Sequence, residues 1–557
     1  MEGIFRSNTR SYDEQYIEVK EGDKIPIPKS MFMKCFNGDF ISIDMKERSY
    51  KCIQSSIKNK PIPGILLLER NKMYGRYKDK YLYRFIPHDV KLPFFLVPYK
   101  QKYGFCKKNV NLYMIISLKD WTDDYPRGQI VETIGDVNDN ENVYRYILWC
   151  KELDFYFQNN TLGKILFKRY RAKTHEEWIE CIQQEYTIED RTKEATISQG
   201  YVYHVFSIDP PDCKDIDDAI SILKVTKDLL KISIYIADVP LWLDTLQLWD
   251  YLSSRPATIY LPTYKMPMLP TLFSENICSL LEKEKRFAFV MDIFLDANNF
   301  TISGIEYKHV LMEVEDNYTY DDVGHKNDYD QLFKIAQLWN KERTYCESIE
   351  DAHDLVAFYM IFMNHEMAKW CKNNEIGIFR STIENEHLYY DNYYSGMYTV
   401  NREDTAHKTL KLDSYIHITS PLRRIVDLLN MMMIQSVFNI LSEDGKEVRN
   451  NMYRKWTSMK QMEILNIQMK QICRVQNDVS LIDKVTKHPD ILLKEYDCIC
   501  VERMTRDYNY VFFLPELYIY KQVSTMKQIE LHKHYNMRLY IFHDVANVRR
   551  KIMGEII

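Results

Sequence analysis

The sequence predicts a multidomain α+β protein with β-rich segments at both ends, a central α/β region and a set of long helices. Its 557 residues are enough for roughly three to five domains. Short strand-like runs separated by Gly, Pro and Asn-Gly turns fill residues 25–170 and return at 496–557. Helical periodicity instead dominates residues 329–479, so the two kinds of structure occupy separate parts of the chain.

Two successive arrays of strands in the N-terminal part favour two small β-barrels. Representative runs are DFISID, GILLLER, YLYRFIP and NLYMIISL, and we expect the boundary between the arrays near residues 101–109. A helix is expected between residues 171 and 190, because apolar side chains recur there at helical spacing. Strands alternate with turns over residues 200–310. The long helices are expected at residues 329–345, 352–373, 427–440 and 453–479.

The composition bears on the surface charge of the protein and on its cellular compartment. The net charge of −5 excludes a uniformly basic coat, so any nucleic-acid site must be a local channel. The 12 Cys lack the dense spacing of a disulfide scaffold, and we expect reduced thiols in a cytoplasmic protein. The N-terminus is too charged for a signal peptide. The most apolar stretch, residues 428–441, is shorter than a membrane span, so no membrane partner is expected.

The segment SIDPPDCKDIDDAISI carries five carboxylates within ten residues: Asp209, Asp212, Asp215, Asp217 and Asp218. In a strand, Asp215 and Asp217 would share one face, and the Pro-Pro turn could fold Asp209 back to meet them. Carboxylates at contact distance repel each other unless a cation lies among them, and Mg²⁺ prefers such hard oxygen ligands. Because apolar residues flank the cluster, we predict a buried magnesium site and not a solvated acidic loop.

Two other metals fit this cluster less well. An EF-hand calcium loop requires a central Gly and a final Glu, and both are absent from the segment. Zinc would require a CxxC pair or paired His beside Cys213, and the sequence offers neither there.

A second charged motif, HITSPLRRIVDLL, places Arg423 and Arg424 at the expected start of an apolar helix. Thr419, Ser420 and Pro421 supply a predicted N-cap and a first-turn Pro. Helix N-termini attract anions, and two guanidinium groups there would clamp a phosphate. An Arg pair alone is more often a surface salt-bridge donor. Together with the acidic cluster, however, it indicates phosphoryl transfer.

Four motifs in order resemble the RNB domain of the ribonuclease II / ribonuclease R family, which includes the catalytic subunit of the eukaryotic exosome. They are IDPPDCKDIDDAI, IYIADVPLWL, SSRPATIYLPTYKMPMLPTLFSENICSLLEKEKR and HITSPLRRIVDLL. The run WTDDYPRGQIVETIGDVND resembles the second cold-shock barrel of the eukaryotic branch, and residues 38–98 resemble the first. The C-terminal β region resembles the family's S1 barrel.

The resemblance implies a fold in five parts. These are an N-terminal segment with a cold-shock-like OB-fold barrel (1–100), a second such barrel (101–175), a linker (176–198), an α/β RNB catalytic domain with C-terminal helices (199–484) and an S1-like OB barrel (485–557).

The resemblance also implies a processive 3′→5′ exoribonuclease that hydrolyses single-stranded RNA to nucleoside 5′-monophosphates. Its implied ligands for Mg²⁺, or for Mn²⁺ as a substitute, are Asp209, Asp215, Asp217 and Asp218. Asp217 and Arg423 are the implied catalytic residues. Tyr260 and Tyr320 are implied to stack on bases near the RNA 3′ end, where Arg424 also contacts RNA. We expect a monomer and leave open its association with a larger RNA-processing complex.

The chain departs from the family pattern in ways that keep other functions open. Phe358 stands where the family usually has Glu, six residues before Asn364, and Met431 replaces the usual His after SPLRR. Residues 343–353 and 377–412 look shortened. One alternative is a weak or inactive RNB-fold protein that binds RNA without cutting it. Another is a phosphatase or nucleotidyl transferase, which would require neither the barrels nor the SPLRR motif.

Overall fold

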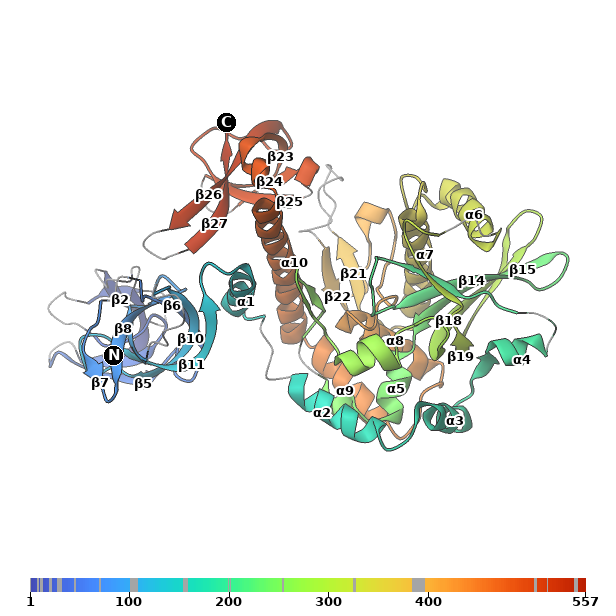
Figure 1. Ribbon diagram of the computed structural model, residues 1–557, viewed down its shortest axis with the longest axis horizontal. Coiled ribbons are helices and arrows are strands. Elements are labelled where there is room, and N and C mark those ends of the chain that lie inside the picture. The colour runs from blue at the N-terminus through green and yellow to red at the C-terminus, as the bar shows by residue number, and fades with distance from the viewer. Residues whose placement is uncertain are drawn as a thin grey trace. The chain divides into compact units, whose positions relative to one another are not determined.

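The protein is described here from a computed structural model of residues 1–557 (Figure 1). The description covers the whole chain except residues 1, 8–9, 11–13, 20–22, 28–32, 45–46, 70–71, 101–108, 154–158, 199, 201, 253–254, 324–326, 383–395, 505–507, 518 and 545–548. The chain divides into two compact units. Unit 1 is Met1–Asp154 together with Asn477–Ile557, and unit 2 is Phe155–Gln476. The multidomain α+β prediction is confirmed.

The N-terminal part of unit 1 holds one open sheet and one closed barrel. The antiparallel sheet has the order β3-β2-β1-β4-β5, with β1 Glu2–Ser7, β2 Gln15–Glu18, β3 Lys24–Pro26, β4 Phe40–Asp44 and β5 Ser49–Gln54. The barrel closes because β6 pairs with both β10 and β8, and β9 joins β8 to β11. Its strands are β6 Ile62–Leu66, β8 Lys80–Pro87, β9 Phe95–Tyr99, β10 Leu112–Asp120 and β11 Arg127–Asp136.

The division between these two β structures differs from the expected one near residue 100. The open sheet ends at Gln54 and the barrel begins at Ile62, so β8 and β9 belong with β10 and β11. Strand pairing decides this, since β9 lies between β8 and β11 in the barrel. Residues 101–108, where the boundary was expected, lie outside the described residues.

The C-terminal part of unit 1 is a five-stranded antiparallel sheet preceded by the long helix α10 (Met459–Lys487). The strand order is β25-β24-β23-β26-β27, with β23 Glu495–Arg503, β24 Asn509–Leu514, β25 Ile519–Ser524, β26 His534–Asp544 and β27 Arg549–Ile556. The expected return to β structure is therefore present. Its assignment as an S1-like barrel remains a prediction.

Unit 2 is built on a seven-stranded sheet with the order β12-β19-β18-β15-β14-β13-β20. The strands are β12 Glu189–Arg191, β13 Phe206–Asp209, β14 Asp218–Lys224, β15 Leu229–Ala237, β18 Lys285–Asp296, β19 Ile302–Glu313 and β20 Asp316–Thr319. Side chains alternate between its two faces, as strand geometry requires. Phe289 and Met291 therefore pack in one hydrophobic core, and Ala288 and Val290 pack in the other.

Helices cover both faces of this sheet (Figure 1). One core is completed by α6 (Asn327–Arg343) and α7 (Ala352–Asn373), and the other by α5 (Val239–Thr245) and α8 (Ile425–Val437). The remaining helices are α2 Asn159–Tyr170, α3 His175–Glu185, α4 Lys193–Ile197 and α9 Lys446–Thr457. The first three long helices expected from periodicity are present within about three residues of their predicted bounds. The fourth, expected at 453–479, is instead two helices, α9 and α10, which together extend beyond both predicted ends.

Residues 176–198 were expected to be a linker, but they fold as part of unit 2. They contribute most of α3, all of α4 and the edge strand β12, which pairs in parallel with β19. Arg191 in this strand is buried and pairs with the buried carboxylate of Asp292. Because a buried ion pair of this kind depends on tertiary contacts, helical periodicity alone could not reveal it.

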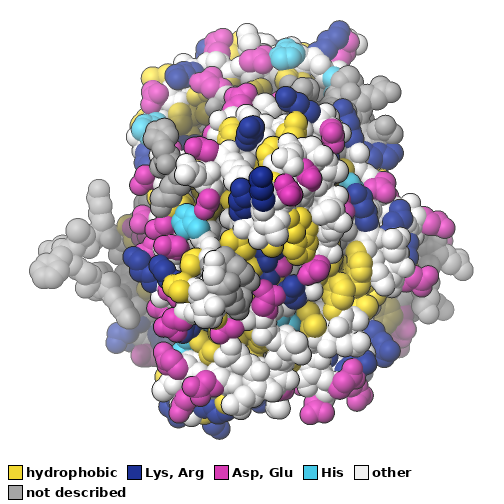
Figure 2. Space-filling model, turned by 90° about the vertical axis from the view of Figure 1, so that its right-hand side faces the viewer, with side chains coloured by type: hydrophobic (Ala, Val, Ile, Leu, Met, Phe, Trp, Pro, Cys, Tyr) yellow, Lys and Arg dark blue, Asp and Glu magenta, His cyan; other side chains and the backbone are white. Residues whose placement is uncertain are grey.

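Surface charge agrees with the low net charge. On the face shown in Figure 2, acidic and basic side chains are interspersed, with apolar side chains between them. Among the described residues, no helix is both long enough and apolar enough to cross a membrane.

Candidate active site in unit 2

The acidic segment forms a turn between two adjacent strands of the unit 2 sheet. β13 ends at Asp209, β14 begins at Asp218, and the two strands pair antiparallel. The Cys213 N–H donates to the carbonyl of Pro210 at 3.2 Å, which tightens the turn. Two carboxylates thus lie at neighbouring strand ends, as expected of a Pro-Pro turn that folds the chain back.

Asp217 is less exposed than Asp215 and is held at both of its oxygens. Its side chain is only 2% exposed. Its Oδ1 accepts a hydrogen bond from the Leu422 N–H at 2.9 Å, and its Oδ2 accepts one from Arg423 Nε at 2.8 Å. Burial raises the pKa of Asp217 to about 7, although Arg423 opposes the shift. The expectation that Asp215 and Asp217 share one face of a strand is wrong, because both precede β14.

Asp209 and Asp218 are half-buried carboxylates at the facing ends of β13 and β14. Burial raises the pKa of Asp209 to about 6 and that of Asp218 well above its usual value. The nearby charges of Asp209 and Asp217 raise the pKa of Asp218 further. In the described part of the chain, Asp209 Oδ2 is buried without a hydrogen-bond partner. A hard cation such as Mg²⁺ fits this environment, because it would satisfy the orphaned oxygen and offset the repulsion.

Asp215, like Asp217, has both of its carboxylate oxygens engaged by protein groups. Lys265 Nζ donates to Oδ1 at 2.7 Å, and the Tyr260 hydroxyl donates to Oδ2 at 3.0 Å. The Tyr260 residue is nevertheless 40% exposed. Sequence reasoning missed Lys265. The available indication was the short turn between Tyr260 and Lys265, which pair opposite each other in a two-stranded sheet, β16 (Ile259–Tyr260) and β17 (Lys265–Met266).

The arginine pair lies just before helix α8 and not within its first turn. The helix begins at Ile425, and Arg424 occupies the N-cap position. The predicted cap at Ser420 is wrong, because the Ser420 N–H donates to the Asp427 carboxylate at 2.8 Å. Arg424 pairs with the same carboxylate at 2.8 Å. Arg423 therefore reaches Asp217 from an irregular segment, and its side chain is 45% exposed.

Tyr320 lies close to the acidic site. Its ring contacts that of His353, with the ring centroids 5.4 Å apart. Burial raises the pKa of Tyr320, and the charges of Asp209 and Asp218 raise it further. The structure thus brings this predicted RNA-binding residue into electrostatic reach of the two aspartates.

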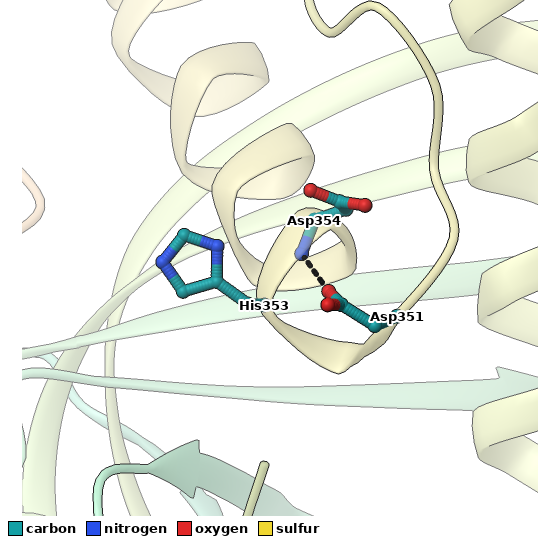
Figure 3. Close-up of side chains that lie close together, drawn as sticks. All are labelled: Asp351, His353 and Asp354. Carbon is teal, nitrogen blue, oxygen red and sulfur yellow. Dashed lines mark hydrogen bonds between the residues drawn. The ribbon is translucent and has the colours of Figure 1, made fainter. Parts of the chain in front are cut away.

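A second group of possible metal ligands lies at the start of α7. Asp351, His353 and Asp354 have potential ligand atoms within 4.8 Å of one another. Asp351 caps the helix, since its Oδ1 accepts from the Asp354 N–H at 2.9 Å (Figure 3). Asp354 also accepts from the Glu350 N–H. Helix capping explains this group, so it carries no argument for a metal.

Comparisons with known proteins match the chain to one family. The RNB domain matches residues 201–337, and the Dis3-like cold-shock domain 2 (CSD2) matches residues 82–150. The chain belongs to the RNB family. The second match overlaps the closed barrel of unit 1, which supports the cold-shock assignment of that barrel.

Individual RNB relatives are distant in sequence. The probable exosome complex exonuclease RRP44 of Caenorhabditis elegans is 26% identical over 252 residues, which is 42% of this chain and 24% of that protein. Ribonuclease R of Mycoplasmopsis pulmonis is 36% identical over 148 residues, which is 26% of this chain and 19% of that protein. The matched regions thus span about a quarter or less of these relatives' lengths.

Solved structures resemble the complete chain. Mycoplasma genitalium RNase R in complex with ribose methylated single-stranded RNA gives a TM-score of 0.66 at 15% identity, with 100% of both chains covered. Yeast Ssd1, described as a pseudonuclease, gives a TM-score of 0.55 at 12% identity, covering 97% of this chain and 81% of that one. At these identities the likeness shows an RNase R-like fold and not an activity.

The departures from the RNB pattern lie in the hydrophobic core. Phe358 and Met431 are both fully buried, and Phe358 packs against Tyr345 with the ring centroids 5.6 Å apart. A pocket beside Asp218 is lined on the α7 side by apolar side chains that include Met360. The helix therefore presents an apolar face beside the acidic site. Of the region that looks shortened, residues 383–395 lie outside the described residues.

The zinc alternative finds no support at this site. Burial raises the pKa of the Cys213 thiol to about 12, and the charges of Asp209 and Asp215 contribute to the shift. A thiol must lose its proton to bind zinc. The oxygen-rich surroundings of Cys213 therefore favour a magnesium site over a zinc site.

Proposed function

We propose that the protein is a 3′→5′ exoribonuclease that degrades single-stranded RNA processively, by Mg²⁺-dependent hydrolysis, to nucleoside 5′-monophosphates. One observation carries the proposal: the buried Asp217, fixed by Arg423 and the Leu422 N–H, lies in electrostatic reach of Asp218, which Asp209 also affects. Family membership supports the same reaction.

The chain's own groups would divide the work as follows. Asp209, Asp215, Asp217 and Asp218 would hold Mg²⁺, which would supply Lewis-acid stabilisation of the scissile phosphate and activate the attacking water. The half-exposed guanidinium of Arg423 is available to a phosphate oxygen, because only its Nε is committed to Asp217 and one terminal nitrogen to Ser420. The metal ion and the Arg423 guanidinium would together offset the negative charge of the aspartates, so that the site could bind an anionic phosphate.

Two aromatic side chains would hold the RNA end. The Tyr260 ring is accessible while its hydroxyl is anchored on Asp215, and the Tyr320 ring lies within reach of the acidic site. Base stacking on such rings is worth about 1–3 kcal/mol and tolerates any sequence. Discrimination against DNA would depend on contacts to the 2′-hydroxyl.

The proposed activity can be tested with 5′-labelled single-stranded RNA resolved on a gel. We expect a short labelled end product with Mg²⁺ or Mn²⁺, no cleavage in EDTA, binding without turnover in Ca²⁺, and no degradation of DNA. A 3′-phosphate should slow the reaction. Internal fragments, or equal cleavage in EDTA, would contradict an exonuclease that uses this acidic site.

The competing function is RNA binding without cleavage. The buried Phe358 at the family's usual Glu position is the observation that favours it, because that Glu normally helps to handle the RNA 3′ end. An RNA-binding protein would retain its affinity and leave the 5′-labelled RNA intact in every metal. The intact Asp217–Arg423 pair instead favours the enzyme.

A further inference from the structure

His204 lies between two carboxylates that come from different elements of unit 2. Its Nδ1 lies 3.0 Å from an Asp328 oxygen, and its Nε2 lies 3.4 Å from an Asp316 oxygen. Asp316 is the first residue of β20, and Asp328 lies in the first turn of α6. The imidazole also contacts the Phe206 ring, with the ring centroids 5.4 Å apart. The His204 ring therefore joins the starts of two elements that follow each other closely in the chain.

The segment between these two contacts carries Tyr320. β20 pairs in parallel with β13, which places Thr319 opposite Asp209, and Tyr320 follows directly. The Asp322 N–H donates to the Thr319 carbonyl at 3.1 Å, so Tyr320 lies in a turn at the end of the strand. His204 thus holds both ends of the segment that brings Tyr320 to the acidic site.

Only a protonated His204 can make both contacts as hydrogen bonds. A neutral imidazole donates from one nitrogen and presents a lone pair at the other, whereas an imidazolium donates from both. Ionised carboxylates only accept, so a neutral ring would turn one lone pair toward the negative charge of Asp316 or Asp328. The two contacts together therefore require the charged ring.

The groups around His204 favour this charge. The hydrogen bond with Asp328 raises the pKa of His204, and burial of the ring opposes the shift. Asp316 and Glu315 raise the pKa further, while the Tyr318 hydroxyl donates to the same Asp316 oxygen at 2.6 Å. The His204 side chain is still 23% exposed, so its charge can follow the pH of the solvent. The bridge is complete at low pH and is lost as the pH rises through the raised pKa.

We propose that protonated His204 is a positioning residue that closes the segment 316–328 and so holds Tyr320 where it can stack on the RNA 3′ end. This inference rests on the RNA-binding part of the proposed function. Stacking of RNA on Tyr320 and protonation of His204 would favour the same arrangement of the segment, so each must strengthen the other. Bound RNA should therefore raise the pKa of His204, and affinity for the RNA end should fall as the pH rises.

Binding of a short RNA oligomer to the full chain in Ca²⁺ tests the bridge without turnover. We expect His204→Gln to bind about three- to tenfold more weakly than the wild type at pH 6, and equally at pH 9, because the wild type has then lost its charge too. His353→Gln is the matched control, since His353 contacts the Tyr320 ring from α7. Its affinity relative to the wild type should be the same at both pH values. A ratio for His204→Gln that does not change with pH would overturn the proposal.

A double variant decides whether His204 acts through Tyr320. If it does, the loss of His204 should matter little once the ring is gone. His204→Gln in a Tyr320→Ala background should then change affinity at pH 6 by less than about twofold. An equal loss in both backgrounds would show that His204 supports the fold alone, and it would overturn the proposal.

The charge of His204 can also be followed directly by NMR of ¹³C-labelled histidine rings, with its signal assigned from His204→Gln. Titration should give a pKa above the usual value of about 6.5, and Asp328→Asn should lower it. Adding the oligomer in Ca²⁺ should raise the wild-type pKa further. A wild-type pKa that neither Asp328→Asn nor the oligomer changes would overturn the bridge.

These measurements separate the possible failures. If the wild type binds no RNA, the proposed function fails together with the role of Tyr320, and the titration still decides whether the bridge between Asp316 and Asp328 exists. If His204→Gln unfolds, Asp328→Asn takes its place in the binding series, because it removes one side of the bridge and keeps the histidine.

Discussion

The acidic site of unit 2 and the β7–β8 hairpin of unit 1 use charge in opposite ways. In unit 2, the carboxylates of Asp217 and Asp218 are buried and half-buried, and desolvation raises the pKa of both. In unit 1, the ring of Tyr77 on β7 (Arg76–Tyr77) is surrounded by cations, with Lys119 Nζ 4.3 Å and the Arg127 guanidinium carbon 5.2 Å from its centroid. Lys119 is exposed, and its Nζ lies 2.6 Å from the Tyr77 hydroxyl.

This difference suggests that the acidic site of unit 2 would carry out the chemistry, whereas the cations around Tyr77 in unit 1 would contribute to RNA affinity. A buried acidic cluster gains from one strongly bound cation in a fixed geometry, so single substitutions there should have large effects. Exposed cations beside an aromatic ring suit the phosphates and bases of a flexible strand, and each such contact contributes little. Substitutions in the two regions should therefore differ both in size and in what they change.

The largest effect is expected for Asp217→Asn. The substitution removes the charge that Arg423 and the metal would share, so turnover should fall by about 10²–10³-fold or more, while RNA affinity barely changes. The measurement is single-turnover cleavage together with binding of the same RNA in Ca²⁺. Asp228→Asn, an exposed aspartate in the β14–β15 turn, is the matched control and should behave as the wild type. A fully active Asp217→Asn would remove Asp217 from the mechanism.

The raised pKa of Asp217 leads to a prediction about how the folding stability of the metal-free protein depends on pH. The pKa of this carboxyl group is about 7 in the fold and about 4 when unfolded, so between these values the folded state holds the extra proton. The contribution of Asp217 to stability therefore falls as pH rises from about 4 to 7. In EDTA, the Tm of Asp217→Asn relative to the wild type should increase between pH 5 and pH 8.

Added Mg²⁺ supplies the complementary test. Because the metal requires the deprotonated carboxylates, it should raise the Tm of the wild type more at pH 8 than at pH 5. The Asp217→Asn variant should gain less from Mg²⁺ at pH 8. A difference in Tm between the two proteins that is constant with pH would show that Asp217 does not titrate in this range.

The sequence predicted those features of the site that depend on local sequence patterns. It did not predict those that depend on tertiary contacts. The Pro-Pro turn, the apolar flanks and the helix at 352–373 are local, and their predictions agree with the structure. The start of α8 could not be predicted, because Asp427 takes the Ser420 N–H and leaves Arg424 at the cap. The Lys265–Asp215 contact also depends on pairing across 50 residues, which no local pattern contains.

An intermediate effect is expected for Tyr260→Ala. Loss of about 1–3 kcal/mol of stacking corresponds to about 5- to 150-fold weaker binding of a short oligomer, and the final product should become longer. Long RNA should lose much less affinity, because phosphate contacts elsewhere dominate its binding. Tyr264→Ala is the matched control, since Tyr264 lies in the same hairpin at 37% exposure against 40% for Tyr260. An unchanged product length would remove Tyr260 from the handling of the RNA end.

The smallest effect is expected in unit 1, where Lys119→Gln removes one exposed cation beside Tyr77. If Lys119, which lies on β10, contacts one phosphate, the slope of log affinity against log salt concentration should fall by about 0.7, as for single strands. Affinity for long RNA should fall only a few-fold, and turnover of a very short oligomer should not change, because the acidic site is intact. Binding isotherms at several salt concentrations measure the slope, with Lys60→Gln, an exposed lysine between β5 and β6, as the control. Equal slopes for the two variants would mean that Lys119 makes no phosphate contact. A loss of turnover in Lys119→Gln on the short oligomer would instead break the comparison itself, because a cation of unit 1 would then take part in the chemistry assigned to unit 2.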